Sequence, residues 1–377
     1  MKMKAAVLRE VGAKRPYAAS QPIRIEEVEL DPPQDGELLV RIVGGGLCHS
    51  DLSMINGDRS RPVPVVIGHE GSGEVVEVGP GVRDMSPGDP VIFQFSASCG
   101  RCVNCLGGRT QLCETHAAAR AKGHLMGGGS RLKDSAGSEI AHHSGVSCFA
   151  EYAVVDRGSA VKVDKDLPLA DAAIFGCAVM TGVGAVMNTA RIRVGDMVAI
   201  VGLGGVGLNG LLGAKVAGAE KIIAIDISDD KLGLARQLGA THTVNATDED
   251  HIQQVMDITS GGVDYAFEFS GTVPGTETCY NSLRAGGEVL IAGLAPNKSE
   301  FKFNPADIVN SEKAIRGSYM GSCVPVRDIP RFIELYRQGR LPVDKLINRS
   351  IGFDELNEAF DKLSDGLVIR QILEPQS

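Results

Sequence analysis

The sequence contains no tryptophan, and only 5% of its 377 residues are aromatic. Basic residues are outnumbered by acidic ones, 38 to 47, so the formal net charge is −9 at pH 7, and there is no long run of lysine and arginine. Binding to nucleic acid or to an anionic membrane surface needs a positive patch, which such a chain does not provide. These absences exclude both classes and favour small molecules or copies of the same chain as partners.

Apolar segments that would target or anchor the chain are also missing. The N-terminal MKMKAAVLREVG lacks the continuous apolar stretch of a secretory signal. Residues 197–214 are uncharged and long enough to suggest a membrane span, but six of these positions are glycine. Such a composition favours a tight turn followed by a closely packed helix, so we expect a cytoplasmic protein.

The chain is long enough for two domains, and its pattern changes along its length. Up to about residue 160 it has short β-branched runs separated by glycine and proline, such as ELLVRIVGGG, which predict an irregular antiparallel β domain. From about residue 194 strand patterns alternate with helical patterns, which predicts a doubly wound parallel sheet. A mixed tail ending in LVIRQIL is expected to rejoin the first domain. The predicted class is therefore α/β.

The hexapeptide GLGGVG at 202–207 follows an apolar strand and opens a helix, which is the context of a dinucleotide-binding turn. Gly202 permits the turn, Gly204 lets the backbone approach the pyrophosphate, and Gly207 permits close helix packing. Asp226 ends the next strand, where a carboxylate accepts hydrogen bonds from the adenosine ribose and repels the 2′-phosphate of NADP. The prediction is an NAD site.

Four of the nine cysteines, Cys99, Cys102, Cys105 and Cys113, lie within CGRCVNCLGGRTQLC. Their spacing allows one loop to place four thiolates around a zinc ion. Four thiolates leave no open coordination position, so this site is expected to stabilise the fold and not to carry out the reaction. An iron–sulfur cluster and a disulfide pair are the alternatives.

A reactive metal needs three protein ligands and an open position. Cys48 in GLCHSD, His69 in GHEG and Cys177 in FGCAVMTG together provide a Cys2His set. Each residue alone could be an ordinary buried side chain. The three together are a candidate ligand set for such a metal.

With these motifs, the chain resembles the zinc-dependent medium-chain alcohol dehydrogenases over essentially its whole length. The resemblance rests on GLCHSD, GHEGSGEVVEVGPGV, the four-cysteine loop, GCAVMTGVGAV, GLGGVGL and the terminal IRQIL. It implies a GroES-like catalytic domain formed by residues 1–177 and 322–377, with a Rossmann domain at 178–321 between them. It also implies two zinc ions per subunit, NAD as cofactor, and a homodimer or homotetramer.

The same resemblance implies individual roles. Cys48, His69 and Cys177 would bind the catalytic zinc, with Glu70 as a possible transient ligand and Asp51 hydrogen-bonded to His69. Ser50 would take the proton of the alcohol. The positions expected to contact the cofactor are His49, Thr181, Gly202, Gly204, Gly205, Val206, Gly207, Asp226, Lys231, Gly293, Leu294 and Arg370.

Two departures from the family pattern affect function. Ser53 stands where many relatives carry a histidine that ends the proton relay. Ala117 stands where the glutathione-dependent formaldehyde dehydrogenases carry an arginine. The first departure removes the internal base. The second counts against the glutathione-dependent formaldehyde dehydrogenases, also called S-(hydroxymethyl)glutathione dehydrogenases, so this class is kept as the alternative function.

The substrate pocket departs as well. In HHSGVSCF at 142–149, Ser144 and Gly145 replace an aromatic and an aliphatic wall residue of liver-type relatives, while Phe95, Leu294 and Tyr319 are expected to line the rest. This predicts oxidation of a bulky primary alcohol, aromatic or allylic. Two further alternatives are a zinc-stabilised NAD-binding protein without activity and a zinc-free quinone reductase. The presence of the Cys2His set argues against both.

Overall fold

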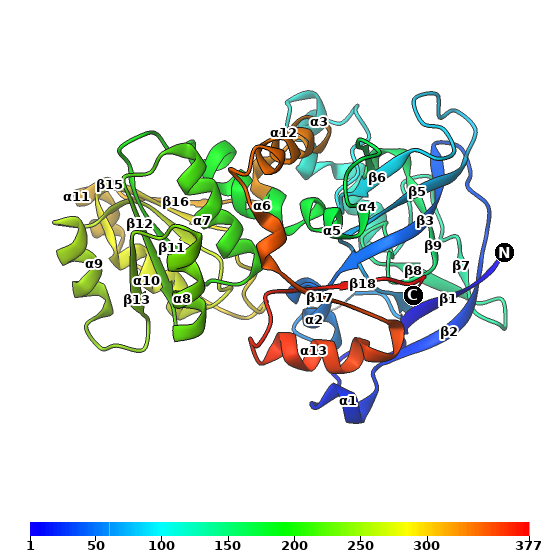
Figure 1. The fold of residues 1–377 in the computed structure, drawn as a ribbon, viewed down its shortest axis with the longest axis horizontal. Coiled ribbons are helices and arrows are strands. Elements are labelled where there is room, and N and C mark those ends of the chain that lie inside the picture. The colour runs from blue at the N-terminus through cyan, green and yellow to red at the C-terminus, as the bar shows by residue number, and fades with distance from the viewer. Residues whose placement is uncertain (60, 377) are drawn as a thin grey trace. The chain divides into compact units, whose positions relative to one another are not determined.

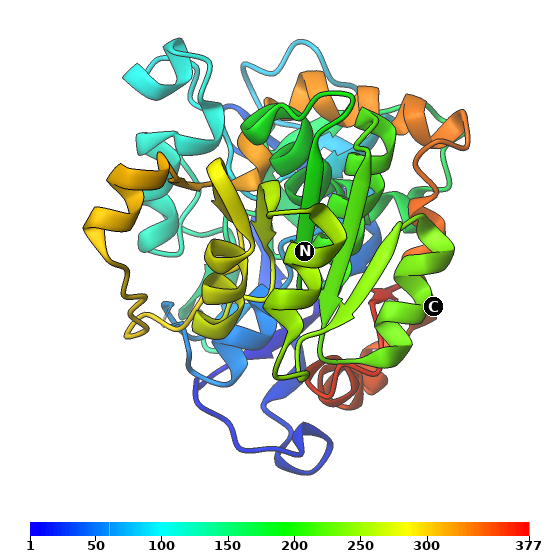
Figure 2. The ribbon, with the colours of Figure 1, turned by 90° about the vertical axis from the view of Figure 1, so that its left-hand side faces the viewer.

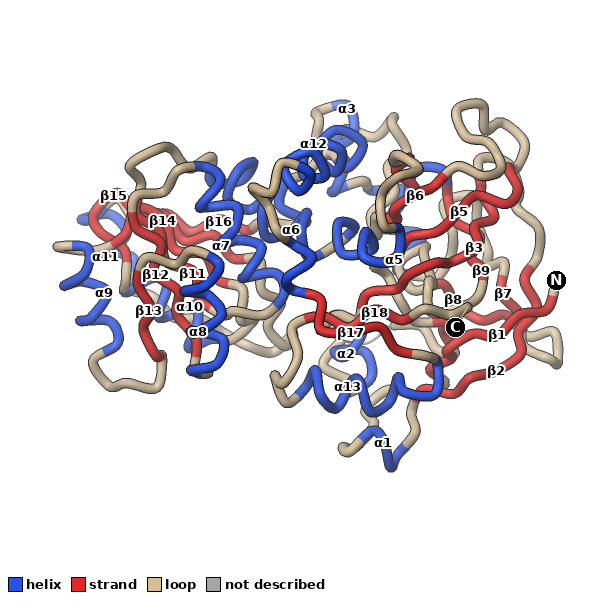
Figure 3. Tube along the Cα trace, viewed as in Figure 1, coloured by secondary structure: helices blue, strands red, loops and turns tan. Residues whose placement is uncertain are grey.

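A computed structural model describes residues 1–59 and 61–376. The chain divides into two compact units. The first contains Met1–Cys177, Val324–Arg331 and Asp344–Ser377, and the second contains Ala178–Cys323 and Phe332–Val343. The sequence assigned the whole of 322–377 to the first unit, whereas the structure groups Phe332–Val343 with the second. Strands predominate in the first unit, and strands and helices alternate in the second (Figure 3).

In the described residues, the first unit contains a closed barrel in the order β1-β2-β7-β8-β4. Neighbouring strands are antiparallel except for the parallel pair β4 and β8. The strands are β1 (Lys2–Leu8), β2 (Ile23–Leu30), β4 (Val65–Val66), β7 (Leu132–Lys133) and β8 (Glu139–His142).

A seven-stranded sheet of the same unit follows the order β10-β6-β5-β3-β18-β17, with β9 also paired to β3. Its strands are β3 (Glu37–Gly46), β5 (Gly71–Val78), β6 (Pro90–Phe93), β9 (Tyr152–Asp156), β10 (Ala160–Lys162), β17 (Ile347–Ile351) and β18 (Arg370–Leu373). The C-terminal strand β18 pairs with β3 through Ile372 and Gly46, so both chain ends build this unit (Figure 1). The pairing places Arg370 next to the loop that begins at Leu47, because the Leu47 amide donates to the Gln371 carbonyl at 3.0 Å.

Short helices connect these strands: α1 (Tyr17–Ser20), α2 (His49–Ile55), α3 (Val103–Leu106), α4 (Glu114–Ala121), α5 (Leu169–Ala172) and α13 (Leu356–Ser364). Helix α2 begins directly after β3, and Leu52, Met54 and Ile55 bury its apolar face. This face joins a core that includes Leu47 and Phe149.

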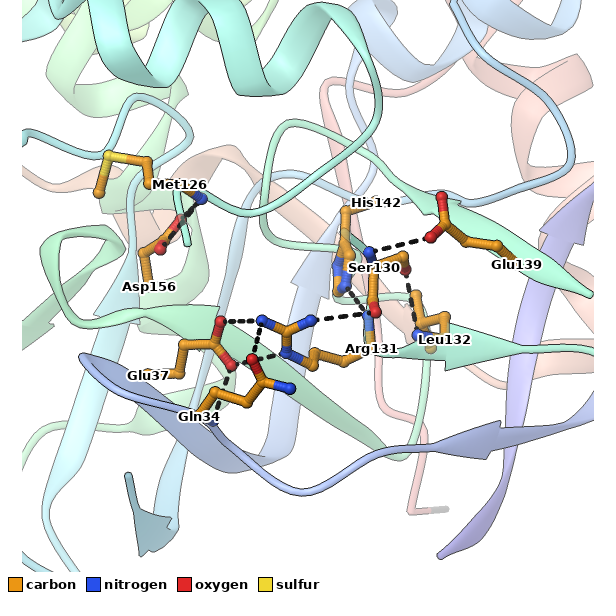
Figure 4. A network of polar contacts seen from close by, with 9 residues as sticks. All are labelled: Gln34, Glu37, Met126, Ser130, Arg131, Leu132, Glu139, His142 and Asp156. Atoms are coloured by element: carbon orange, nitrogen blue, oxygen red, sulfur yellow. Dashed lines mark hydrogen bonds and ion pairs between the residues drawn. The ribbon is translucent and has the colours of Figure 1, made fainter. Parts of the chain in front are cut away.

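A buried ion pair ties the barrel to the larger sheet (Figure 4). The guanidinium of Arg131 donates to both Glu37 oxygens at 2.7 and 2.9 Å, and to Gln34 Oε1 at 3.0 Å. Nearby, both carboxylate oxygens of Asp156 lie 3.1–3.2 Å from the Met126 amide. Burial raises the pKa of Asp156 to about 6. The bidentate geometry pairs both buried charges. The loss of either partner would leave the other charge buried and unpaired, which would destabilise the fold.

The second unit contains a parallel sheet in the order β13-β12-β11-β14-β15-β16 (Figure 2). Its strands are β11 (Met197–Val201), β12 (Lys221–Asp226), β13 (His242–Asn245), β14 (Val263–Glu268), β15 (Leu283–Ile291) and β16 (Ala314–Gly317). The order reverses between β11 and β14, and ligands of doubly wound sheets bind at such a reversal. Right-handed crossovers therefore place α7 and α8 on one face and α9 and α10 on the other.

The helices of this unit are α6 (Ala178–Gly184), α7 (Gly205–Ala217), α8 (Asp229–Leu238), α9 (His251–Thr259), α10 (Val273–Asn281) and α11 (Pro305–Ser311), while α12 (Pro325–Arg337) is divided between the units. Helices α6 and α7 approach closely because their contact positions are glycine. A Cβ atom at Gly182 would lie 2.7 Å from the Gly210 nitrogen, and one at Gly213 would lie 3.0 Å from the Val183 Cα.

The uncharged stretch 197–214 forms strand β11 and most of helix α7. Within the described residues, no single helix is long and apolar enough to cross a membrane. One bent pair, Leu169–Gly176 with Ala178–Ala190, reaches the required length and composition only when both parts are combined.

Candidate functional site

The structure brings the four clustered cysteines together. The sulfur atoms of Cys99, Cys102, Cys105 and Cys113 all lie within 4.8 Å of one another, on the loop that contains α3. The Cys113 sulfur also accepts hydrogen bonds from the amides of Cys99 at 3.3 Å and His116 at 3.5 Å. A tetrahedral zinc site with Zn–S bonds of about 2.3 Å needs sulfurs about 3.8 Å apart. The donor set therefore fits one ion, and it is too compact for a multi-iron cluster.

The thiols of this loop influence one another's ionisation. A hydrogen bond from Thr115, supported by backbone amides, lowers the pKa of Cys99 to about 6. Burial and the neighbouring Cys102 and Cys113 raise the pKa of Cys105 to about 12. Crowded thiolates repel, and a divalent cation removes this repulsion. All four are present as thiols, so the disulfide alternative is wrong for this structure.

A second cluster joins residues from distant parts of the first unit. Cys48 is the N-cap of α2, His69 and Glu70 lie between β4 and β5, and Cys177 follows the turn at 173–176. One ligand atom of each lies within 4.8 Å of the others, and all four residues are buried. Space for the Glu70 carboxylate depends on Gly46, because a Cβ atom there would lie 2.8 Å from Oε1.

Asp51 orients this cluster. Its Oδ2 accepts from the Cys48 amide at 3.2 Å, and its Oδ1 accepts from Nδ1 of His69 at 3.0 Å. The hydrogen bond assigns the proton of His69 to Nδ1 and leaves Nε2 to face Cys48 and Cys177. Nε2 is buried and has no hydrogen-bond partner among the described residues. A carboxylate that holds the other nitrogen of a ligating histidine is the usual arrangement around zinc.

The sequence analysis missed the contribution of His143. Its Nδ1 lies 3.1 Å from Asp51 Oδ1, and its ring lies 5.2 Å from the His69 ring at an angle of 62°. Burial raises the pKa of Asp51, but the charges and hydrogen bonds of His69 and His143 outweigh burial and lower it. The histidine pair in AHHSG was the available signal, although only the fold shows that His143 approaches Asp51.

The charged groups of the cluster shift one another's pKa values. A hydrogen bond from Cys177, with the Arg370 and His69 charges, holds the pKa of Cys48 well below its usual value, and the pKa of Cys177 is raised in turn. Burial raises the pKa of Glu70 to about 7. Arg370 lies 3.5 Å from Glu70 Oε2 and donates to the Leu47 carbonyl at 2.6 Å.

These donors fit a catalytic metal. The two sulfurs and the unpartnered His69 Nε2 form a buried set of the composition that zinc prefers when one position stays open. Glu70 adds a carboxylate whose oxygens make no hydrogen bond. The structure thus places the four predicted ligands together, while their roles remain predictions.

Three further predicted residues lie on α2. His49 begins the helix, followed by Ser50, and Ser53 donates its hydroxyl hydrogen to the His49 carbonyl at 2.8 Å. Ser53 is therefore engaged by its own helix, and it offers no base at neutral pH.

The glycine-rich turn of the second unit has the expected constraints. Gly202 has φ +89° and lies against Ser270, where a Cβ atom would be 2.6 Å from the Ser270 nitrogen. A Cβ atom on Gly207 would overlap the Gly202 carbonyl, whereas Gly204, the N-cap of α7, faces open space. The open side of the turn is therefore at Gly204, where the free backbone amides at the start of α7 can bind a phosphate.

Asp226 ends β12 as predicted and has both oxygens engaged by backbone. Oδ2 accepts from the Leu203 amide at 2.6 Å, and Oδ1 accepts from the Ser228 amide at 3.0 Å. Each oxygen keeps a second lone pair for a ribose hydroxyl. The other predicted cofactor residues of this unit lie on α6 (Thr181), on α7 (Gly205, Val206), on α8 (Lys231) and after β15 (Gly293, Leu294).

Glu268, at the end of β14, was not predicted to matter. Its Oε1 accepts from the Gly271 amide at 2.8 Å and from the Ser270 hydroxyl, and its carbonyl accepts from the Gly293 amide at 2.9 Å. Burial raises the pKa of this carboxyl. Because Ser270 also packs on Gly202, Glu268 fixes the loops on both sides of the strand-order reversal. An acid ending the apolar run VDYAFE was the available signal.

Comparison with protein families gives two matches. Residues 34–168 match the family described as alcohol dehydrogenase GroES-like domain, and residues 205–338 match the zinc-binding dehydrogenase family. Together they cover most of the described chain.

Individual proteins resemble the chain over nearly its full length. It is 35% identical to an S-(hydroxymethyl)glutathione dehydrogenase of Paracoccus denitrificans, covering 99% of this chain and 100% of the relative. It is 38% identical to one of a Synechocystis strain, with the same coverage. The crystal structure of benzyl alcohol dehydrogenase from Acinetobacter calcoaceticus superimposes with a TM-score of 0.91, at 32% identity and 99% coverage of both chains.

Proposed function

Because the chain belongs to the zinc-binding alcohol dehydrogenase family, we propose that it oxidises the hydroxymethyl group of an alcohol to an aldehyde with NAD. The observation that carries the proposal is the buried cluster of Cys48, His69 and Cys177, whose ligand atoms converge within 4.8 Å. A non-catalytic zinc site needs four protein ligands and no open position, as in the four-cysteine loop. A second set with only three such ligands therefore favours an enzyme over a protein without activity.

Cys48, His69 and Cys177 would hold the catalytic zinc, and Glu70 would be available as a transient further ligand. Zinc bound there supplies Lewis-acid polarisation of the alcohol oxygen, and bound NAD supplies the hydride acceptor. Asp51 keeps His69 in the tautomer that presents Nε2 to the metal. The two thiolate ligands and Glu70 carry negative charge, which the buried Arg370 partly offsets.

Ser50 would receive the proton of the alcohol through its hydroxyl, because it follows Cys48 by two residues on α2. Ser53 offers no base to receive this proton, because its hydroxyl donates to the His49 carbonyl, so the proton would leave Ser50 for a group outside this helix. Replacing Ser50 with alanine tests this step. Full activity of Ser50→Ala would remove Ser50 from the mechanism.

The proposed cofactor is NAD, supported by the position of Asp226 at the end of β12. A phosphate at the ribose 2′ position would meet this carboxylate at close range. We therefore expect Asp226→Gly to raise the use of NADP relative to NAD. An unmodified enzyme that prefers NADP would contradict the assignment.

For the substrate, the two curated relatives support S-(hydroxymethyl)glutathione. This substrate carries carboxylates, and Ala117 provides no cation where the sequence comparison expected one. Helix α4, which contains Ala117, also carries Arg120 one turn later. The glutathione adduct is thus our first candidate, and its recognition would use a different basic residue.

An aromatic alcohol is the second candidate, favoured by a specific contact. The Phe95 ring lies edge-on to the His69 ring, with centroids 5.2 Å apart and an angle of 83°. Ser144 and Gly145, both with positive φ values of 55° and 70°, provide no apolar wall beyond His143. The Phe95 ring is therefore an aromatic contact available to an aromatic substrate beside the proposed metal ligand.

The decisive measurement compares kcat/KM of the purified enzyme for S-(hydroxymethyl)glutathione, benzyl alcohol and ethanol, with zinc determined per subunit. A preference for the glutathione adduct supports the first candidate, and a preference for benzyl alcohol supports the second. Ser144→Phe should reduce activity on benzyl alcohol more than on ethanol. Equal values for all three substrates would contradict both candidates.

The chain is also proposed to form a homodimer or homotetramer. Strand β16 lies at the edge of the parallel sheet, and three of its four residues are exposed. An edge strand offers unpaired backbone groups to a second copy. Light scattering of the purified protein tests this, and a monomer at micromolar concentration would contradict it.

A further inference from the structure

His116 lies between the four-cysteine loop and the proposed catalytic cluster. Its side chain belongs to α4 and is only 2% exposed. The backbone amide of His116 donates to the Cys113 sulfur at 3.5 Å, so the start of α4 is fixed to the closed thiolate site. The imidazole of the same residue makes a separate contact.

The imidazole contacts the backbone of Phe95. Its Nε2 lies 3.0 Å from the Phe95 carbonyl oxygen. A carbonyl only accepts hydrogen bonds, so Nε2 carries the proton and donates. Burial lowers the pKa of His116 to about 4, which keeps the ring neutral near pH 7.

Phe95 completes the connection to the catalytic cluster. Its ring meets the ring of His69 edge-on, with centroids 5.2 Å apart. Three successive contacts therefore join Cys113, His116, Phe95 and His69, and every one of them lies within the first unit.

Two further contacts restrict movement of this region. The Ser96 hydroxyl donates to the Gln111 carbonyl at 2.9 Å, which holds the segment after Phe95 to the cysteine loop. A Cβ atom at Gly145 would lie 3.4 Å from His116 Cε1, so the loop after His143 packs directly on the imidazole. His116 thus contacts both Phe95 and the loop that carries Ser144 and Gly145.

We propose that His116 is a positioning residue that holds Phe95 beside His69 and thereby sets the activity of the enzyme on aromatic alcohols relative to small ones. The inference rests on the proposed function, because it assumes that the alcohol binds beside His69. Without the donor at Nε2, the partly buried Phe95 carbonyl loses this hydrogen bond, and the ring loses one restraint on its position. The side chain acts through Phe95 and does not touch the reacting atoms.

The test compares His116→Leu with His116→Gln, which keeps a donor near the place of Nε2. For His116→Leu we expect kcat/KM for benzyl alcohol to fall about tenfold, mainly through KM, while the value for ethanol falls less than about twofold. His116→Gln should retain the ratio of the unmodified enzyme. His124→Gln is the matched control, because it alters another histidine of this unit that bonds the partly exposed Glu139 at 3.0 Å.

Zinc content and Tm are measured for each variant. A lower Tm with an unchanged benzyl alcohol to ethanol ratio would assign His116 a purely structural role and overturn the inference. An equal change in His116→Leu and His116→Gln would also overturn it, since the donor would then be irrelevant. If His116→Leu does not fold, His116→Asn serves instead, because its shorter amide cannot reach the Phe95 carbonyl.

The two proposals fail in different ways. An unmodified enzyme that oxidises none of the tested alcohols overturns the proposed function together with this inference. Full activity with an unaltered substrate ratio in the variants overturns the inference alone.

Discussion

The two sulfur clusters of the first unit contrast in how they are assembled. The closed cluster takes four thiols from fifteen consecutive residues, and three of them are only partly buried. The open cluster takes its ligands from positions 48, 69 and 177, and all are buried. The first can form from a local loop, whereas the second exists only when the fold is complete. In our proposal, stability and reactivity belong to different metal sites.

The two clusters also differ in the groups that surround their ligands. The thiols of the closed cluster are held chiefly by backbone amides and by one another. The open cluster is surrounded by Asp51, Glu70 and Arg370, which orient one ligand and balance the charge. A site that must bind substrate needs this control, because its ligands have to stay oriented while one coordination position is left open.

The largest effect is expected when a ligand of the open cluster is removed. Cys48→Ser should lower kcat by at least about 1,000-fold, because the loss of metal polarisation removes several kcal/mol of transition-state stabilisation. Zinc should fall by one ion per subunit, and Tm should change little. Zinc analysis, steady-state kinetics and thermal unfolding measure the three quantities. Retained turnover would show that this cluster is not the reactive one.

Removal of a closed-cluster ligand should give the reverse pattern. Cys102→Ser should lose one zinc and lower Tm by about 10 °C, since a few kcal/mol corresponds to several degrees for a domain of this size. At temperatures well below the new Tm, kcat should stay within about threefold of the original, because no reacting group has changed. An inactive variant with an unchanged Tm would reverse the roles assigned to the two clusters.

A smaller effect is expected at Asp51, which touches the open cluster without being a ligand in the proposal. Asp51→Asn keeps the shape but weakens the hydrogen bond to His69 Nδ1. Loss of such a partner typically costs about 10- to 100-fold in metal affinity. Competition with a chelator should therefore remove the catalytic zinc first, while the closed site keeps its ion. Equal loss from both sites would contradict the comparison.

The comparison also explains which features were predictable. The closed cluster and the glycine-rich turn are local, so spacing and flanking patterns sufficed to predict them. For the open cluster, residue type alone left Cys177 indistinguishable from an ordinary buried thiol, and the family resemblance was needed. His116, His143 and Glu268 were missed because their importance depends on partners distant in sequence, or on loops that meet only in the folded sheet. The structure divides the chain differently at Phe332–Val343 for the same reason, since the amphipathic pattern of this segment does not specify the unit to which it belongs.

The smallest effect is expected at Cys148, a buried thiol close to the open cluster that we assign to neither metal. Its Sγ donates to the Glu70 carbonyl at 3.3 Å and lies where a Cβ atom on Gly71 would be only 2.9 Å away. Burial raises the pKa of this thiol well above its usual value, so it stays protonated and is a poor ligand. Cys148→Ala should therefore keep both zinc ions and most of kcat, with a loss of about 1 kcal/mol in the free energy of unfolding from the missing sulfur contacts. Zinc analysis and denaturant unfolding, run beside Cys48→Ser, provide the measurement. Loss of a zinc ion from Cys148→Ala would show that burial near the cluster, and not membership of the Cys2His set, decides metal binding.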